Sequence, residues 1–181
     1  MTDLMQAIKE RRSIRNFEQE TVKEEDLNQI LEAVRWAPSW TNCQPWELIV
    51  VKDQAVKEKL QASLPPKGNP AIKAIVQAPV LLVLCGKTKI SGYYKGEPST
   101  KLGDWFMFDL GIAAQNICLS AHALGLGTVI VGLFDHNKAN EAVNVPEGFE
   151  LVAMIPLGYP ATTGSAPPRK DVGEFTHHET Y

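Results

Sequence analysis

Apolar residues recur at three- and four-residue spacing in some parts of the chain and run continuously in others. The first pattern predicts amphipathic helices, and short runs rich in β-branched residues predict strands. The helical pattern covers a short segment around Leu4, Met5 and Ile8, then about 24–37, 54–63, 101–124 and 136–143. The strand pattern covers 46–51, 79–85, part of 125–134, and 149–160.

Local polar residues indicate where two of these helices begin. Thr21 and Glu24 have the spacing of a capping box, and the helix that follows ends before Pro38. Asp135 is placed to cap the short helix 136–143.

The predicted helix 101–124 is apolar on nearly every side. Its only charged residues are Lys101, Asp104 and Asp109. A helix that is apolar all round must be buried all round. In a chain of 181 residues, we expect a partner subunit to complete that burial.

The order of elements bears on the fold class. Helices and strands do not alternate strictly as βαβ units, which favours an α+β fold over a doubly wound sheet. We expect one domain over residues 1–181, in which the Pro- and Gly-rich tail 161–181 forms an extended arm. The polar loop 87–100 is unusually long, and loops of that length are often functional.

Composition argues against several classes of protein. The chain has 44% hydrophobic and 22% charged residues with a net charge of -3, which is unlike a general nucleic-acid binder. The N-terminus is too charged for a signal peptide, and no apolar run reaches the roughly 18–20 residues of a membrane span. Cys43, Cys85 and Cys118 are far apart and indicate reduced thiols rather than a zinc site. We therefore expect a cytoplasmic protein.

Positive charge is concentrated after the first predicted helix, where Arg11, Arg12 and Arg15 lie within five residues. One interpretation is a solvated helix end, where cations are favoured. The other is a bound anion, since arginine holds phosphate through a rigid fork of donors. Arg169 and Lys170 follow a proline-stiffened part of the tail and could close over the same anion.

Residues 37–46, APSWTNCQPW, lie between a predicted helix and a predicted strand. Short polar residues there are typical of turns. Alternatively, Pro38 and Ser39 form a flat wall for a planar polar ring, and Asn42 and Gln44 supply amide donors and acceptors.

Other sequence features limit the kinds of binding site and reaction that we expect. Gly132 interrupts a β-branched run, which indicates a bulge or the close approach of a ligand. No GxGxxG after a strand, P-loop, GxSxG or HExxH occurs, so a Rossmann nicotinamide site is not indicated. Cys43 has no histidine or carboxylate within its segment to activate it, and we assign no catalytic histidine.

Five segments occur in an order and spacing that closely resemble the nitroreductase family of flavin enzymes, over about residues 4–174. They are RRSIRNF (11–17), APSWTNCQPWELIVV (37–51), GIAAQNICLSAHALGLGT (111–128), VGLFD (131–135) and PPRK (167–170). The resemblance implies a central mixed or antiparallel sheet flanked by helices. It also implies a domain-swapped homodimer around a long buried central helix, with two FMN molecules at the interface.

The resemblance assigns candidate cofactor-binding residues. The candidates that bind the phosphate, ribityl chain and pyrimidine edge of FMN are Arg11, Arg12, Ser13 and Arg15. Arg169 is a further candidate for the phosphate. The residues that reach the flavin from the partner subunit are Pro38, Ser39, Trp40, Asn42 and Gln44. The backbone at Val131 and Gly132 faces flavin N5. Further candidates are Asn69 and Lys73 for the ribityl and ring oxygens, and Lys170 as a second tail cation.

The implied activity is ping-pong hydride transfer from NAD(P)H through FMN to a nitroaromatic, quinone or similar small acceptor. FMN carries the chemistry, while the protein supplies position and electrostatics. Two alternatives stay open. One is reductive dehalogenation, with Tyr93, Tyr94, Lys95 and Glu97 binding a zwitterionic substrate. The other is a flavin-binding protein without turnover.

Overall fold

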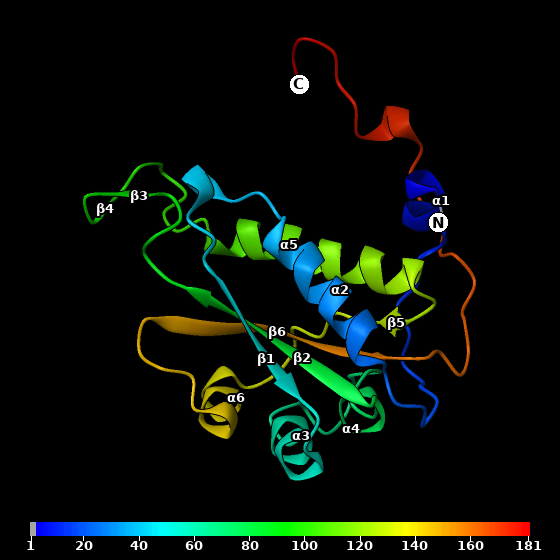
Figure 1. Cartoon of the computed structure of the whole chain (residues 1–181). Helices are drawn as coiled ribbons and strands as arrows, with labels where there is room; N and C mark the ends of the chain where they lie inside the picture. The colour runs from blue at the N-terminus through cyan, green and yellow to red at the C-terminus, as the bar shows by residue number, and fades with distance from the viewer. Residues whose placement is uncertain (1–2) are drawn as a thin grey trace.

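One sheet lies between two groups of helices in the computed structural model of the chain, which describes residues 3–181 (Figure 1). In chain order the helices are α1 (Leu4–Glu10), α2 (Glu24–Arg35), α3 (Gln54–Gln61), α4 (Ala74–Gln77), α5 (Phe106–Ala123) and α6 (His136–Val143). The strands are β1 (Trp46–Val51), β2 (Val80–Lys87), β3 (Tyr93–Tyr94), β4 (Glu97–Pro98), β5 (Gly127–Thr128) and β6 (Phe149–Gly158). Short 3-10 helices span Trp40–Asn42 and Val172–Glu174.

The main sheet has the strand order β1-β2-β6-β5, and every neighbouring pair is antiparallel. Val83 at the middle of β2 lies opposite Ile49 of β1 on one side and Met154 of β6 on the other. The α+β class is therefore confirmed, with an antiparallel sheet.

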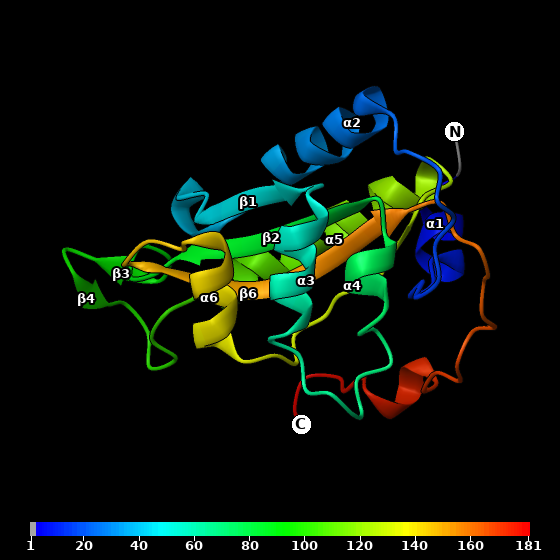
Figure 2. The ribbon, with the colours of Figure 1, turned by 90° about the horizontal axis from the view of Figure 1, so that it is seen from below.

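Helices cover both faces of this sheet. α2 and α5 lie on one face and α3, α4 and α6 on the other (Figures 1 and 2). Leu82 and Leu84 of β2 pack in the core with α2 and α5, whereas Leu81 and Val83 pack in the core with α3 and α4. A strand buried on both faces reads as a continuous apolar run, which explains the pattern at 79–85.

α5 begins at Phe106 rather than near 101 as predicted. Gly103 has φ 73°, which breaks the helical path, and the Asp104 carboxylate accepts a hydrogen bond from the Phe106 N–H at 3.2 Å. Within one chain α5 is not buried all round, because Met107 and Phe108 are 56% and 61% exposed. Burial of this face by a second subunit stays a prediction.

Two other local predictions have opposite outcomes. The capping box at Thr21 and Glu24 is wrong: α2 begins after Lys23 with no side-chain cap, and Glu24 pairs with Lys52 instead. Asp135 caps α6 as predicted, by accepting a hydrogen bond from the Lys138 N–H at 3.2 Å.

Two connecting segments differ from their predicted form. The loop 87–100 contains the small hairpin β3–β4, whose turn at Lys95 and Gly96 has φ values of 52° and 84°. The predicted strand within 125–134 shortens to β5 and an isolated bridge at Val131, which pairs with Met154 of β6.

The tail 161–181 is exposed along its whole length and contains one short 3-10 helix. Its start is held by a hydrogen bond from the Ala161 N–H to the Asn16 carbonyl at 3.1 Å. Figure 1 shows the tail leaving the sheet beside α1. Among residues 3–181, no helix has the length and apolar character needed to cross a membrane.

The arginine-rich segment, residues 11–15, packs against β5 and leaves no room for a side chain at Gly127. A Cβ there would lie 2.5 Å from Ile14 Cγ1 and 2.8 Å from its Cβ, and Ile14 is buried. We expect Gly127→Ala to lower the free energy of unfolding by about 1–3 kcal/mol through overpacking, measured by urea denaturation. The control Gly173→Ala meets no atom within 4 Å and should leave the midpoint unchanged. An unchanged midpoint for Gly127→Ala would show that Ile14 is free to move.

Candidate functional site

The arginine-rich segment runs along the edge of the sheet after α1 ends. Ser13 forms a parallel bridge with Thr128 of β5, and the Ile14 N–H donates to the Thr128 carbonyl at 2.9 Å. Ile14 is buried, whereas Ser13 and Arg15 on either side of it are exposed. The backbone therefore holds the segment, and the arginine side chains are left to line the surface.

The tail meets this segment at a pocket of about 190 Å³. It is lined by Arg11, Arg12, Ser13, Arg15, Gly164, Ser165, Pro167 and Arg169. No carboxylate is among the lining residues, and within residues 3–181 no ion pair involves any of the four arginines. Lys170 is exposed and does not line this pocket.

A neighbouring pocket of about 240 Å³ shares Arg15 with the first. Asn69 lines it and donates a side-chain hydrogen bond to the Leu133 carbonyl at 3.2 Å. Val131 and Gly132 line it as well. Lys73 is exposed and lies outside the lining. The structure thus brings Asn69, Val131 and Gly132 together beside Arg15.

The backbone of this second pocket is only partly hydrogen-bonded. The Val131 N–H and C=O both pair with Met154 at 2.9 Å. Gly132 follows, and a Cβ there would meet no atom within 4 Å. In the part of the chain that the structure describes, no hydrogen bond engages the Gly132 N–H, which leaves it free for a ligand in this pocket.

The segment 38–44 lies elsewhere in the same chain. Pro38, Asn42 and Gln44 line a separate pocket of about 410 Å³ with Arg35 and Trp36 at the end of α2. This pocket shares no lining residue with the two arginine pockets. Figure 1 shows the turn near the N-terminal end of α5, whereas α1 lies near its C-terminal end.

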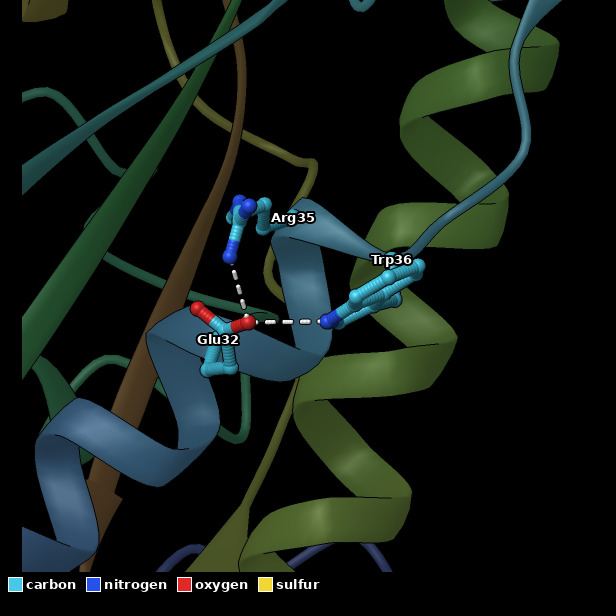
Figure 3. Close-up of polar contacts among 3 residues, drawn as sticks. All are labelled: Glu32, Arg35 and Trp36. Atoms are coloured by element: carbon cyan, nitrogen blue, oxygen red, sulfur yellow. Dashed lines mark hydrogen bonds and ion pairs between the residues drawn. The ribbon is translucent and has the colours of Figure 1, made fainter.

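Polar contacts at the end of α2 fix the approach to this turn. Glu32 Oε1 accepts hydrogen bonds from Arg35 and from the Trp36 indole, both at 2.8 Å (Figure 3). Trp36 is nevertheless 73% exposed. The exposed indole and Arg35 are therefore held beside Pro38 by one carboxylate.

The turn itself has an unusual backbone. Thr41, Asn42 and Gln44 have φ values of 45°, 58° and 46°, the left-handed region that non-glycine residues rarely adopt. Such conformations cost of the order of 1–3 kcal/mol each and concentrate at functional sites. Ser39 supports the turn because its hydroxyl accepts from the Gln44 N–H at 2.9 Å.

The model of the nitroreductase family matches residues 8–159. The chain belongs to the nitroreductase family. The match includes the arginine segment, the 38–44 turn, Asn69 and Gly132, and it ends before Arg169.

Relatives and solved structures agree with this membership. A putative NADH dehydrogenase/NAD(P)H nitroreductase of Methanothermobacter thermautotrophicus is 34% identical over 163 residues, covering 88% of this chain and 78% of the relative. An FMN reductase [NAD(P)H] of Bacillus subtilis is 33% identical over 192 residues, covering 100% of this chain and 75% of the relative. The crystal structure of a putative NADH dehydrogenase/NAD(P)H nitroreductase from Bacteroides thetaiotaomicron has a TM-score of 0.84 at 28% identity, covering 100% and 99% of the two chains.

One residue of this nitroreductase-family chain was missed as a candidate from the sequence. Asp109, only 2% exposed, accepts hydrogen bonds from Ser91 and from the Trp40 backbone. The available signal was a single acidic residue in the middle of an otherwise apolar helical pattern.

The cysteines are poorly suited to nucleophilic chemistry. Burial, and then the Asp109 carboxylate, raise the pKa of Cys43 above its ordinary value. Burial raises the pKa of Cys85 to about 11 and also raises the pKa of Cys118. Over residues 3–181, no group of three or more His, Cys, Asp or Glu side chains is arranged to hold a metal ion.

Proposed function

We propose that this chain is an FMN-dependent oxidoreductase that transfers hydride from NAD(P)H to a small organic acceptor. The observation that carries the proposal is the pocket at which Arg11, Arg12, Arg15 and Arg169 meet without a carboxylate. Four cations in one place repel one another unless an anion joins them. A dianionic phosphate fits that donor set, since arginine binds phosphate in a bidentate manner. The name of the Bacillus subtilis FMN reductase supports FMN as the phosphate's source.

Each pocket receives a part of FMN in this proposal. Arg11, Arg12, Ser13 and Arg169 bind the phosphate and ribityl chain. The isoalloxazine ring occupies the second pocket, between Arg15 and the 131–133 backbone. Because the Val131 N–H already pairs with Met154, we assign the contact with flavin N5 to the Gly132 N–H.

A second copy of the chain completes the site. The 38–44 turn does not line the arginine pockets of its own chain, so its proposed flavin contacts through Pro38, Ser39, Trp40, Asn42 and Gln44 must come from a partner. Exposed apolar side chains on α1 and α5, including Leu4, Met5, Met107 and Phe108, supply surface for such a homodimer. We propose that the dimer buries them.

The protein's own groups bind and orient the reactants. FMN, when bound, supplies the hydride chemistry. The guanidinium of Arg15 lies at the junction of the two pockets and stabilises negative charge at the pyrimidine edge. The open space beside Gly132 admits NAD(P)H and the acceptor in turn, which predicts ping-pong kinetics. No acid–base side chain is required for this exchange.

The decisive experiment is an anaerobic stopped-flow mix of the FMN-loaded protein with NADH and, separately, with NADPH. We expect the flavin absorbance to bleach with either or both and to return when a quinone or nitroaromatic is added. A protein that binds FMN without bleaching would be a flavin carrier. Including a halogenated aromatic amino acid among the acceptors tests the dehalogenase alternative. In that alternative the zwitterionic substrate binds to the β3–β4 hairpin through Tyr93, Tyr94, Lys95 and Glu97.

Arginine substitutions separate the two pockets. Arg11→Ala removes a charged partner of the phosphate, worth about 2–3 kcal/mol, and should weaken FMN binding roughly 30- to 150-fold.

Arg15→Ala should instead lower the flavin midpoint potential and slow hydride uptake at saturating FMN. Fluorescence titration and potentiometry measure the two effects. Lys59→Ala on α3, which is exposed and lines neither of these pockets nor that of the 38–44 turn, is the control for loss of a surface cation. Equal potentials for the wild type and Arg15→Ala would refute the pyrimidine-edge assignment.

The homodimer is tested independently of activity. We expect sedimentation velocity at micromolar concentration to show a dimer, because obligate interfaces of this kind bury on the order of 2,000 Å² or more. Phe108→Glu places a charge on the exposed face of α5 and should shift the population toward monomer. The control Val50→Glu makes the same apolar-to-glutamate change at an exposed residue of β1, on a different surface. A stable FMN-loaded monomer would contradict the proposal.

A further inference from the structure

Asp109 is a buried carboxylate for which the proposed hydride transfer has no use. It lies in the first turn of α5 and is 2% exposed. In the chain from residue 3 onward, no lysine or arginine forms an ion pair with it. A buried charge is unfavourable unless hydrogen bonds satisfy it, so its hydrogen-bond donors indicate what it holds in place.

Those donors come from two segments that are distant in sequence. The Ser91 hydroxyl donates to Asp109 Oδ2 at 2.6 Å, and the Trp40 N–H reaches the two carboxylate oxygens at 3.2 and 3.3 Å. The Cys43 thiol lies 3.9 Å from Oδ2. Because burial raises the pKa of Cys43, this thiol stays protonated and able to donate. The Asp109 carboxylate thus joins the 38–44 turn to the start of the loop 87–100, which contains Ser91.

The 38–44 turn needs such an anchor because its backbone is strained. Thr41, Asn42 and Gln44 have positive φ values, and strained conformations persist only where surrounding contacts enforce them. Within the turn, Gln44 bonds to Ser39 and to Asn42. The Asp109 bond to the Trp40 N–H ties that local network to the rigid helix α5.

The hairpin side of the junction is equally well defined. The Ser91 carbonyl accepts from the Trp105 N–H at 3.0 Å, and the Trp105 indole donates to Thr100 at 2.8 Å. The rings of Trp40 and Trp105 lie 5.3 Å apart. Figures 1 and 2 both show the turn beside the β3–β4 hairpin.

We infer that Asp109 is a positioning residue that fixes the 38–44 turn against the base of the hairpin, so that both form one preorganised wall of the partner's flavin site. The inference rests on the proposed function, in which the turn contacts FMN held by the other copy. Asp109 touches neither arginine pocket and acts through Trp40, Cys43 and Ser91. It therefore sets the position of the wall without contacting the cofactor.

The test compares Asp109→Asn with Asn116→Ala. Asn116 is another polar residue of α5, and its side chain donates a hydrogen bond to the Ala33 carbonyl at 2.8 Å, so its change loosens α5 without touching the turn or the hairpin. Two readouts are measured on full-length protein. The first is the near-UV circular dichroism of the Trp40–Trp105 pair without FMN, and the second is the FMN dissociation constant. We expect Asp109→Asn to lose the tryptophan-pair signal and to weaken FMN binding roughly 10- to 100-fold, while Asn116→Ala retains both.

Ser91→Ala provides a second variant, which also carries the test if Asp109→Asn fails to fold. It removes the shortest hydrogen bond to Asp109 but keeps the hydrogen bond between the carboxylate and the Trp40 N–H. We therefore expect smaller losses of the tryptophan-pair signal and of FMN affinity than in Asp109→Asn. Wild-type spectra and affinity in both Asp109→Asn and Ser91→Ala would overturn the inference. Equal losses in Asp109→Asn and Asn116→Ala would overturn it too, since they would indicate general loosening of α5. A wild-type protein that binds no FMN would instead refute the proposed function, while the tryptophan-pair comparison would still test the anchor.

Discussion

The burial of β2 on both faces is the constraint on which the rest of the structure depends. Helices must cover each side of the sheet, which leaves little of either face open to a ligand. The edge and ends of the sheet are therefore the main places where a ligand can bind. The arginine segment uses this edge: Ser13 and Ile14 pair with β5 through their backbone. The exposed side chains of this segment are free to carry charge, because the backbone pairing and the buried Ile14 hold it in place.

The charged residues at that edge are paired differently from the charged residues elsewhere on the protein. Glu32, Glu24 and Asp135 each pair with a nearby cation, and exposed pairs of this kind contribute little to stability. The four arginines of the pocket lack such partners within residues 3–181. In the proposed function, an anion bound there relieves their mutual repulsion, which links its binding to the stability of this corner.

The sequence predicts those features that repeat or that follow from local chemistry. β2 was recognisable because burial on both faces leaves a continuous apolar run, and α6 because Asp135 caps it. The gathering of Arg11, Arg15 and Arg169 was also accessible, since clustered arginines indicate an anion.

The misses have a common physical origin in contacts between distant segments. Glu24 pairs with Lys52 rather than capping its own helix, and no local pattern reveals such a choice. Asp109 appeared as one charged residue on an apolar helix, and its partners Trp40 and Ser91 lie 69 and 18 positions away.

The placement of Arg169 on an exposed arm has a kinetic consequence. Within the part of the chain that the structure describes, residues 163–170 make no hydrogen bond to the rest of the protein. In the proposed function, ordering this stretch over the FMN phosphate costs conformational entropy, which lowers the affinity below what four guanidinium groups would give on a rigid frame. In that proposal the arm must also move away before the phosphate dissociates, so the length and stiffness of this short segment set the residence time of FMN.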